Sequence, residues 1–193
     1  MKGLNEFRDE LVISQEKFVK SVNSYLQENS SDTSIKYITN YKDKEHEFTS
    51  PKSYKGTFLF RGLFFDKVDN KKMIELRRLI KTYKMASIES WTTDSDLAAI
   101  FASGHSTYDI QLGTDIFDIS SKMPKDQAGV ILKMFIQKDS DIAWDGKYSS
   151  ENSSYSFNIS NNEDSEMIVK KHRPKLEIYA IMNNGDIEFE IED

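Results

Sequence analysis

Cysteine is absent from this sequence of 193 residues, and histidine occurs only three times. Without cysteine the chain has no disulfide, no thiolate metal site and no cysteine nucleophile, which is usual for proteins of a reducing compartment. His46, His105 and His172 lie far apart in the chain and show no metal-ligand spacing. We therefore expect no bound metal.

Long apolar runs are also missing. No stretch approaches the roughly 20 apolar residues that cross a membrane. Residues 1–6 lead directly into charged sequence, where a signal peptide needs an apolar segment. We expect a cytoplasmic protein with no membrane partner. The formal net charge of −6 also argues against a protein that coats nucleic acid nonspecifically.

The rest of the composition is that of an ordinary globular domain. Hydrophobic residues make up 38% of the chain and charged residues 30%, and the length is sufficient to bury a core. We expect one domain over residues 1–193, with a helical N-terminal extension over residues 1–44 and a core over residues 57–193.

The N-terminal extension has helical periodicity. Between residues 5 and 28 apolar side chains recur every three or four positions, and charged residues lie between them. A second helix is predicted to begin at a cap formed by Asp32 or Thr33 and to end near Tyr41. We expect both helices to pack on the core, in preference to the alternative of a partner-binding arm. The apolar residues of the first helix are Phe7, Leu11, Phe18, Val22, Tyr25 and Leu26.

A strand is predicted over residues 57–61, because Phe58 and Phe60 alternate with Leu59 and Arg61. The strand ends in a cation followed by a glycine. A guanidinium at that place suits a diphosphate, since its planar fork forms paired, charge-assisted bonds to phosphate oxygens. Taken alone, Arg61 is better explained as a surface arginine at the end of a strand.

A second strand and a short helix are predicted over residues 88–104. Residues 88–92 mix β-branched, aromatic and small hydroxyl side chains. Thr93 and Asp96 have the spacing of a capping box. Leu97, Ile100 and Phe101 then share one helical face, which we expect to be buried. Gly104 is placed to end the helix.

The second half of the chain is rich in strand patterns. Asn183, Asn184 and Gly185 stand between alternating runs and predict a hairpin. Residues 145–163 are rich in serine and asparagine and predict an exposed loop. Residues 106–125 show no clear pattern. The whole predicts an α+β fold with N-terminal helices on a largely antiparallel, two-sheet core. Strands are predicted at residues 129–136, 141–144, 166–171, 175–182 and 187–191.

One further predicted helix, over residues 70–84, has a basic face. Between Asp66 and Lys84 there are seven basic and three acidic side chains. A solvated helix face is the simplest explanation. The functional alternative is that the cations between Lys71 and Lys84 contact the phosphates of a polyanion.

Four short motifs, taken together, resemble the Arg-Ser-Glu class of the mono-ADP-ribosyltransferases. In that family an arginine on an early strand, a Ser-x-Ser/Thr strand end, an Ala/Phe-rich helix and a late Glu-x-Glu pair follow one another. Here the order is Arg61, Ser90-Trp91-Thr92, Phe101-Ala102 and Asp164-Ser165-Glu166. The resemblance covers roughly residues 57–182. Size and layout are most similar to small transferases of T-even-like phages and to bacterial ADP-ribosylating toxins. The His-Tyr-Glu order of the diphtheria-like branch is missing.

The resemblance implies an NAD-dependent enzyme and assigns a role to each motif. Arg61 would bind the diphosphate of NAD, and the main chain of Gly62 would hold the nicotinamide amide. Ser90 would brace Glu166, and Thr92 would support the strand end. Glu166 would bond the ribose 2′-hydroxyl and stabilise the oxocarbenium-like transition state. Phe101 would pack near the nicotinamide, although a plain core position explains it equally well.

The acceptor of the ADP-ribose is less defined by these residues. Family members that modify arginine have glutamate two residues before the catalytic Glu, and members that modify asparagine or guanine have glutamine. Asp164 keeps the negative charge but is one methylene shorter. The loop before Glu166 would recognise the acceptor, with Tyr155 or Phe157 as an exposed aromatic. We expect a protein arginine to be the acceptor and the protein to be a phage effector or bacterial toxin, with an antitoxin or other neutralising protein as a possible partner.

Two other functions are consistent with the sequence. The same enzyme would modify an RNA or DNA base if the helix between Lys71 and Lys84 guides nucleic acid to the site. A noncatalytic binding or immunity module that has kept a degenerate transferase fold is the second alternative. Both alternatives share the motifs of the first, so other evidence must separate them.

Overall fold

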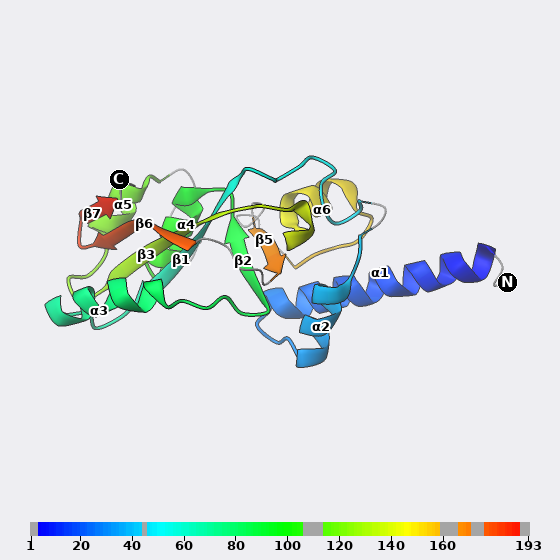
Figure 1. Ribbon diagram of the computed structural model, residues 1–193, viewed down its shortest axis with the longest axis horizontal. Helices are drawn as coiled ribbons and strands as arrows, with labels where there is room; N and C mark the ends of the chain where they lie inside the picture. Colours follow the sequence, from blue (N-terminus) through cyan, green and yellow to red (C-terminus); the bar gives the residue numbers. More distant parts are fainter. Residues whose placement is uncertain (1–3, 44–45, 106–113, 159–165, 171–175, 190–193) are drawn as a thin grey trace.

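The computed structural model describes residues 4–43, 46–105, 114–158, 166–170 and 176–189 (Figure 1). The chain is α+β, as predicted, with one β-sheet and helices on its faces. None of the described helices combines the length and the apolar character that a membrane crossing requires.

Helices α1 (Leu4–Leu26) and α2 (Asp32–Asn40) form the N-terminal extension. Ser31 caps α2, with its hydroxyl accepting from the backbone N of Ser34 at 3.2 Å, so the cap expected at Asp32 or Thr33 is one or two residues too late. Phe18 and Val22 of α1 are buried together with Ile38 of α2 and with residues of the sheet. The prediction that these helices pack on the core is therefore confirmed.

The seven strands of the described residues belong to one sheet in the order β4-β5-β2-β1-β3-β6-β7, and every neighbouring pair is antiparallel. The strands predicted from periodicity are present, with shifted ends. Their bounds are β1 Phe58–Phe65, β2 Ile88–Thr92, β3 Ala128–Phe135, β4 Ile142–Asp145, β5 Glu166–Lys170, β6 Leu176–Asn183 and β7 Asp186–Phe189.

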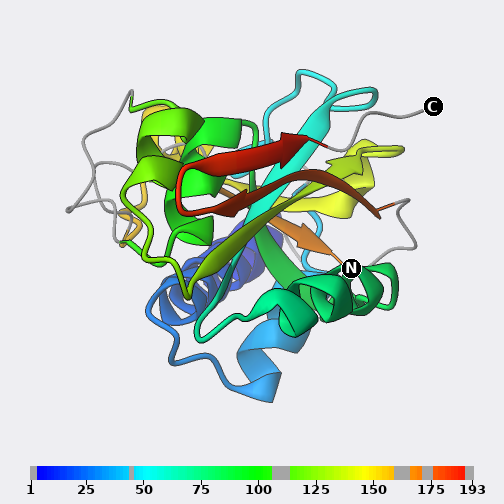
Figure 2. The ribbon, with the colours of Figure 1, turned by 90° about the vertical axis from the view of Figure 1, so that its left-hand side faces the viewer.

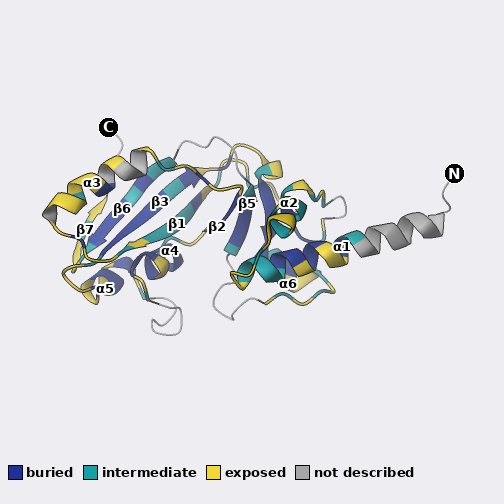
Figure 3. Ribbon diagram, turned by 90° about the horizontal axis from the view of Figure 1, so that it is seen from below, coloured by how far each residue is buried: buried dark blue, intermediate teal, exposed yellow. Residues whose placement is uncertain are grey.

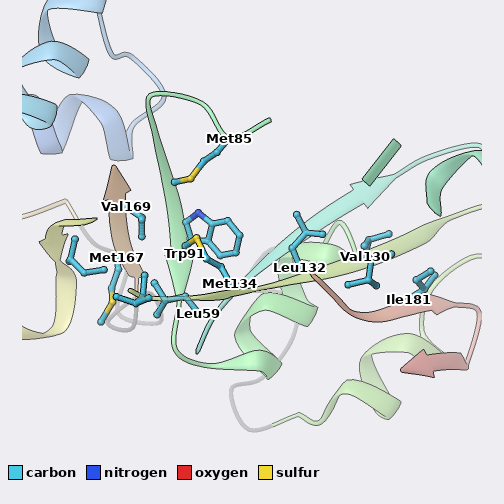
Figure 4. Close-up of a cluster of buried hydrophobic side chains, with 12 residues drawn as sticks. Leu59, Met85, Trp91, Val130, Leu132, Met134, Met167, Val169 and Ile181 are labelled. Atoms are coloured by element: carbon cyan, nitrogen blue, oxygen red, sulfur yellow. The ribbon is translucent and has the colours of Figure 1, made fainter. Parts of the chain in front are cut away.

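The two-sheet core expected from the sequence is wrong, because β1 and β2 remain joined by the register pair Phe60↔Thr92. That pair is a narrow connection, whereas β1 and β3 share eight register pairs. Side chains from both halves of the sheet nevertheless enter one core. Trp91 of β2 and Met167 of β5 lie in the same buried cluster as Leu59 of β1 and Met134 of β3 (Figure 4).

Three helices cover the two faces of the β1-β3-β6-β7 half among the described residues. Helix α3 (Asn70–Lys81) lies on one face, and α4 (Ser95–Ala102) and α5 (Ile116–Ser121) lie on the other (Figure 3). Helix α6 (Gly146–Asn152) falls within the stretch expected to be an exposed loop. The loop prediction is wrong here for a local reason: the carboxylate of Asp145 caps α6 by accepting from the backbone N of Tyr148 at 3.0 Å. A short 3₁₀ turn, η1 (Asp139–Asp141), precedes β4.

The β6–β7 hairpin and the two ends of α4 test the predictions made from local sequence signals. The β6–β7 hairpin is present as predicted, with Asn184 and Gly185 at φ values of 45° and 89° (Figure 2). The predicted capping box of α4 is not used: Asp94, and not Thr93, is the N-cap, and its carboxylate accepts from the backbone N of Asp96 and Leu97. Gly104 follows α4 in the left-handed conformation, as expected.

Candidate active site

A pocket of about 440 Å³ opens where β1 and β2 diverge. This volume lies within the range of roughly 300–1,000 Å³ that small-molecule sites occupy. The structure brings together at this pocket all the described residues that the sequence assigned to the NAD site. They are Arg61 and Gly62 from β1, Ser90 and Thr92 from β2, Phe101 from α4 and Glu166 from β5.

Strand geometry explains why Ser90, Thr92 and Glu166 meet. Alternate side chains of a strand point to the same face, so Ser90 and Thr92 share one face of β2. Thr92 pairs directly with Glu166, and Ser90 pairs with Ile168, two residues further along β5. The carboxylate of Glu166 therefore shares a face with both hydroxyls. The Thr92 hydroxyl also accepts from the backbone N of Asp94 at 3.0 Å, which fixes the turn from β2 into α4.

Arg61 is held at the junction of β1 and β2. Its Nη1 donates to the backbone oxygen of Ser90 at 2.6 Å, and its Nε lies 3.8 Å from Oε2 of Glu89. The side chain remains 28% exposed. A guanidinium in this position is oriented by the protein and still accessible to an anion in the pocket.

Glu89 is a buried carboxylate that sequence analysis missed. Its Oε1 accepts from the Tyr83 hydroxyl at 2.9 Å and from the backbone N of Ala86 at 2.7 Å, while Oε2 faces Arg61. Burial, above all, raises the pKa of Tyr83 to about 12; the charge of Arg61 opposes the rise, and the bond to Glu89 adds to it. A buried carboxylate needs such partners. The available signal in the sequence was a charged residue within the predicted strand, directly after Ile88 and two residues before Trp91.

The end of α1 forms one wall of the pocket. Tyr25 contributes its ring and hydroxyl, and the hydroxyl interacts with the side chain of Ser90. Burial raises the pKa of Tyr25, while the interaction with Ser90 and the charge of Arg61 act in the opposite direction. Leu26, Glu28 and Ser30 line the same wall. No local pattern in residues 25–30 indicated this wall, because it depends on how α1 packs against β2.

Gly62 and Phe101 have structural explanations that the sequence left open. A Cβ on Gly62 would lie 2.1 Å from the backbone oxygen of Ala98 and 2.5 Å from the backbone N of Ala102. The glycine is thus required by the packing of α4 on β1, and its role toward nicotinamide stays a prediction. Phe101 is 42% exposed and lines the pocket, so the expectation that it shares the buried face of α4 with Leu97 and Ile100 is wrong.

Of the three residues assigned to acceptor recognition, Asp164 lies outside the described residues. Tyr155 and Phe157 are half-buried and not exposed as expected. Both rings pack on Phe48, with centroid distances of 5.9 and 6.0 Å, and Phe157 also contacts Trp144 at 5.3 Å. These aromatics join the core that seats α1 and α2. Their proposed role in acceptor recognition remains untested.

The basic face of α3 is solvent-exposed at Lys71, Lys72 and Arg78. None of the described pocket-lining residues belongs to α3. Within the described part of the chain no cluster of three or more His, Asp or Glu side chains is arranged to hold a metal ion.

No protein-family model, curated protein or solved structure matches this chain. The chemistry of the pocket therefore has to be inferred from its own residues. They provide one oriented cation, the carboxylates of Glu28 and Glu166, two strand hydroxyls and aromatic rings on two sides. Such a set suits an anionic ligand that also carries a flat ring and hydroxyl groups.

Proposed function

We propose that the protein is an NAD-dependent mono-ADP-ribosyltransferase of the Arg-Ser-Glu type. The observation that carries this proposal is the convergence of Arg61, Ser90 and Glu166 on one pocket, although 29 and 76 residues separate successive members in the chain. The order of the motifs suggested these three residues, and their common location supports a common ligand. Gly62, Thr92 and Phe101 line the same pocket and strengthen the argument.

The chemistry assigned to the pocket is cleavage of the bond between nicotinamide and ribose. The leaving nicotinamide takes the bonding electron pair, and positive charge develops on the sugar. A carboxylate such as Glu166, placed beside that charge, stabilises the transition state electrostatically. Arg61 would hold the diphosphate through charge-assisted bonds. A nucleophilic nitrogen of the acceptor then bonds to the anomeric carbon and loses its proton, for which Asp164 is the candidate base.

For the acceptor we favour a protein arginine over nucleic acid. The pocket carries the carboxylates of Glu166 and Glu28, which favour a guanidinium over a phosphate backbone. The exposed cations of α3 line no part of the described pocket wall, so the structure provides no specific support for a nucleic acid acceptor. Action as a phage effector or bacterial toxin, with a neutralising partner, belongs to this proposal as its biological setting.

The proposal is tested by two measurements on the purified protein. A ligand that binds only the folded state raises the melting temperature. We therefore expect NAD to raise the melting temperature of the protein, and ADP-ribose to raise it less. We also expect slow release of nicotinamide from NAD in the absence of any acceptor. Stabilisation without nicotinamide release would favour the noncatalytic alternative. If NAD neither stabilises the protein nor releases nicotinamide, the proposed NAD site is rejected.

A further inference from the structure

A row of aromatic rings leads from the pocket to the outer edge of the sheet. Phe60, which lines the pocket, lies 5.0 Å from Tyr179 of β6. Tyr179 lies 5.6 Å from Phe189 of β7, and Phe189 lies 6.3 Å from Phe117 of α5, all between ring centroids. These four residues are called the aromatic row. Helix α5 lies beside β7 at the end of this row (Figure 2).

The outer half of the aromatic row is open to solvent. Phe189 is 39% exposed and Phe117 is 60% exposed. A second pair on the same side of β1 and β3, Phe58 and Phe135, is similarly exposed, and its rings lie 5.3 Å apart. Helices α4 and α5 bury neighbouring parts of this face but leave these rings uncovered. A group of exposed aromatics beside a pocket is typical of an interaction surface.

The elements that carry the outer row are acidic. Helix α5, β6 and β7 together contain four carboxylates and no lysine or arginine. The cation nearest to this face in β3 is Lys133, which pairs with Glu177 at 3.2 Å and lies over the ring of Phe58 at 4.9 Å. These elements therefore offer no uncompensated cation to the phosphate backbone of a nucleic acid. Asp118 and Glu177 lie on the side of the row, whereas Asp186 and Glu188 alternate with Ile187 and Phe189 along β7 and therefore lie on the other face of the sheet.

We propose that the aromatic row is the docking surface for an arginine-bearing, extended segment of the protein substrate. Guanidinium planes stack on aromatic faces and pair with carboxylates, so the exposed rings and the exposed Asp118 beside Phe117 select the same side chain. The row ends at Phe60 inside the pocket, so a segment lying along it would present one arginine toward Glu166. This inference rests on the proposed function and names the substrate class of the same site.

Direct binding tests the docking surface without any catalysis. The probe is a fluorescein-labelled 12-residue peptide of alternating arginine and glycine, followed by anisotropy in the absence of NAD. We expect the double variant Phe117→Ser/Phe189→Ser to weaken binding at least about tenfold, the size of a lost interface anchor. The matched control is Ile74→Ser, which removes an apolar side chain that is 63% exposed on α3, on the opposite face. That variant should bind like the wild type.

A second variant guards against a folding defect. Asp118→Lys places a cation next to Phe117 on an exposed position of α5. We expect it to weaken peptide binding most at low salt, because charge attraction between exposed groups is screened as salt is added. Both variants should release nicotinamide from NAD at the wild-type rate, since neither Phe117, Phe189 nor Asp118 lines the described pocket wall.

The outcomes separate the docking surface from the proposed function. If the variants weaken peptide binding but the protein does not cleave NAD, the docking surface is supported and the proposed enzymatic function is rejected. If the protein cleaves NAD but the peptide does not bind, or binds equally well to the variants, the docking surface is rejected and the enzymatic function is supported. Binding of a labelled oligouridylate that is lost in the double variant would overturn the inference in favour of nucleic acid. A dimer seen by sedimentation that the same variant dissociates would overturn it in favour of self-association.

Discussion

Glu166 and Thr92 are direct register partners across β5 and β2, and Ser90 stands on the same face two residues before Thr92. The carboxylate is therefore positioned by a strand ladder, which holds a side chain more firmly than a loop does. Tyr25 of α1 lines the same pocket and interacts with Ser90. The candidate site is thus assembled from three strands, α4 and the end of the N-terminal helix.

Arg61→Ala should destabilise the fold as well as the site. The substitution removes the cation that faces Glu89 and leaves a buried carboxylate without its charge partner. We expect the free energy of unfolding to fall by roughly 1–3 kcal/mol in urea titrations. Adding Glu89→Gln to the same chain should recover part of that loss. A double variant that is less stable than Arg61→Ala would contradict the pairing.

Tyr25→Phe should slow NAD cleavage while leaving the fold intact. It removes the hydroxyl that interacts with Ser90 and keeps the ring in the pocket wall. We expect kcat to fall about 2- to 10-fold, the value of one hydrogen bond, and KM to change less. The matched control is Tyr37→Phe, whose hydroxyl donates to the backbone oxygen of Ser14 away from the pocket. Equal kinetics of the two variants would remove Tyr25 from the site.

Stability should fall at alkaline pH because of Tyr83. Its pKa is raised from 10 to about 12 in the folded protein, so the folded state keeps a proton that the unfolded state loses above pH 10. The contribution is fully present below pH 10 and is lost as the pH rises toward 12, since the unfolded state then binds fewer protons. In Tyr83→Phe the free energy of unfolding should decline less steeply between pH 9.5 and 11. If the free energy of unfolding depends on pH in the same way in both proteins, Tyr83 is not the cause of the alkaline loss of stability.

Gly62→Ala should lower stability through a clash with α4. The added Cβ would meet the backbone of Ala98 and Ala102, neither of which can rotate away. Overpacking of this kind costs about 1–3 kcal/mol, which thermal unfolding would detect. Gly56→Ala is the comparison, because its Cβ meets nothing within 4 Å and carries only the penalty of a φ of 89°. Gly62→Ala should be the less stable of the two proteins.

Local patterns predicted the parts of the fold that depend on neighbouring residues. Alternation of Phe58 and Phe60, the continuous apolar run of β3 and the Asn184-Gly185 turn each correspond to the observed element. The face shared by Ser90 and Thr92 also follows from alternation alone. The order of the motifs led to Arg61 and Glu166, which the structure brings to one pocket.

The features that the sequence did not predict depend on contacts between residues far apart in the chain. The single sheet depends on the pair Phe60↔Thr92, which joins residues 32 positions apart. Tyr25 enters the pocket because α1 crosses β2, and no pattern within α1 reports that contact. Tyr155 and Phe157 were expected to be exposed because their surroundings are polar. Phe48 packs against both rings, and Trp144 packs against Phe157.

Substitution of Glu166 by glutamine tests the central claim most directly. The change keeps the size of the side chain and removes its charge, so the fold and most of the affinity for NAD should remain. With radiolabelled NAD we expect nicotinamide release and transfer to the arginine-glycine peptide to fall by at least about 100-fold, the cost of losing one transition-state stabiliser. The matched control, Glu75→Gln, alters an exposed glutamate of α3 and should behave like the wild type. Near-normal nicotinamide release by a folded Glu166→Gln protein would contradict the proposed site.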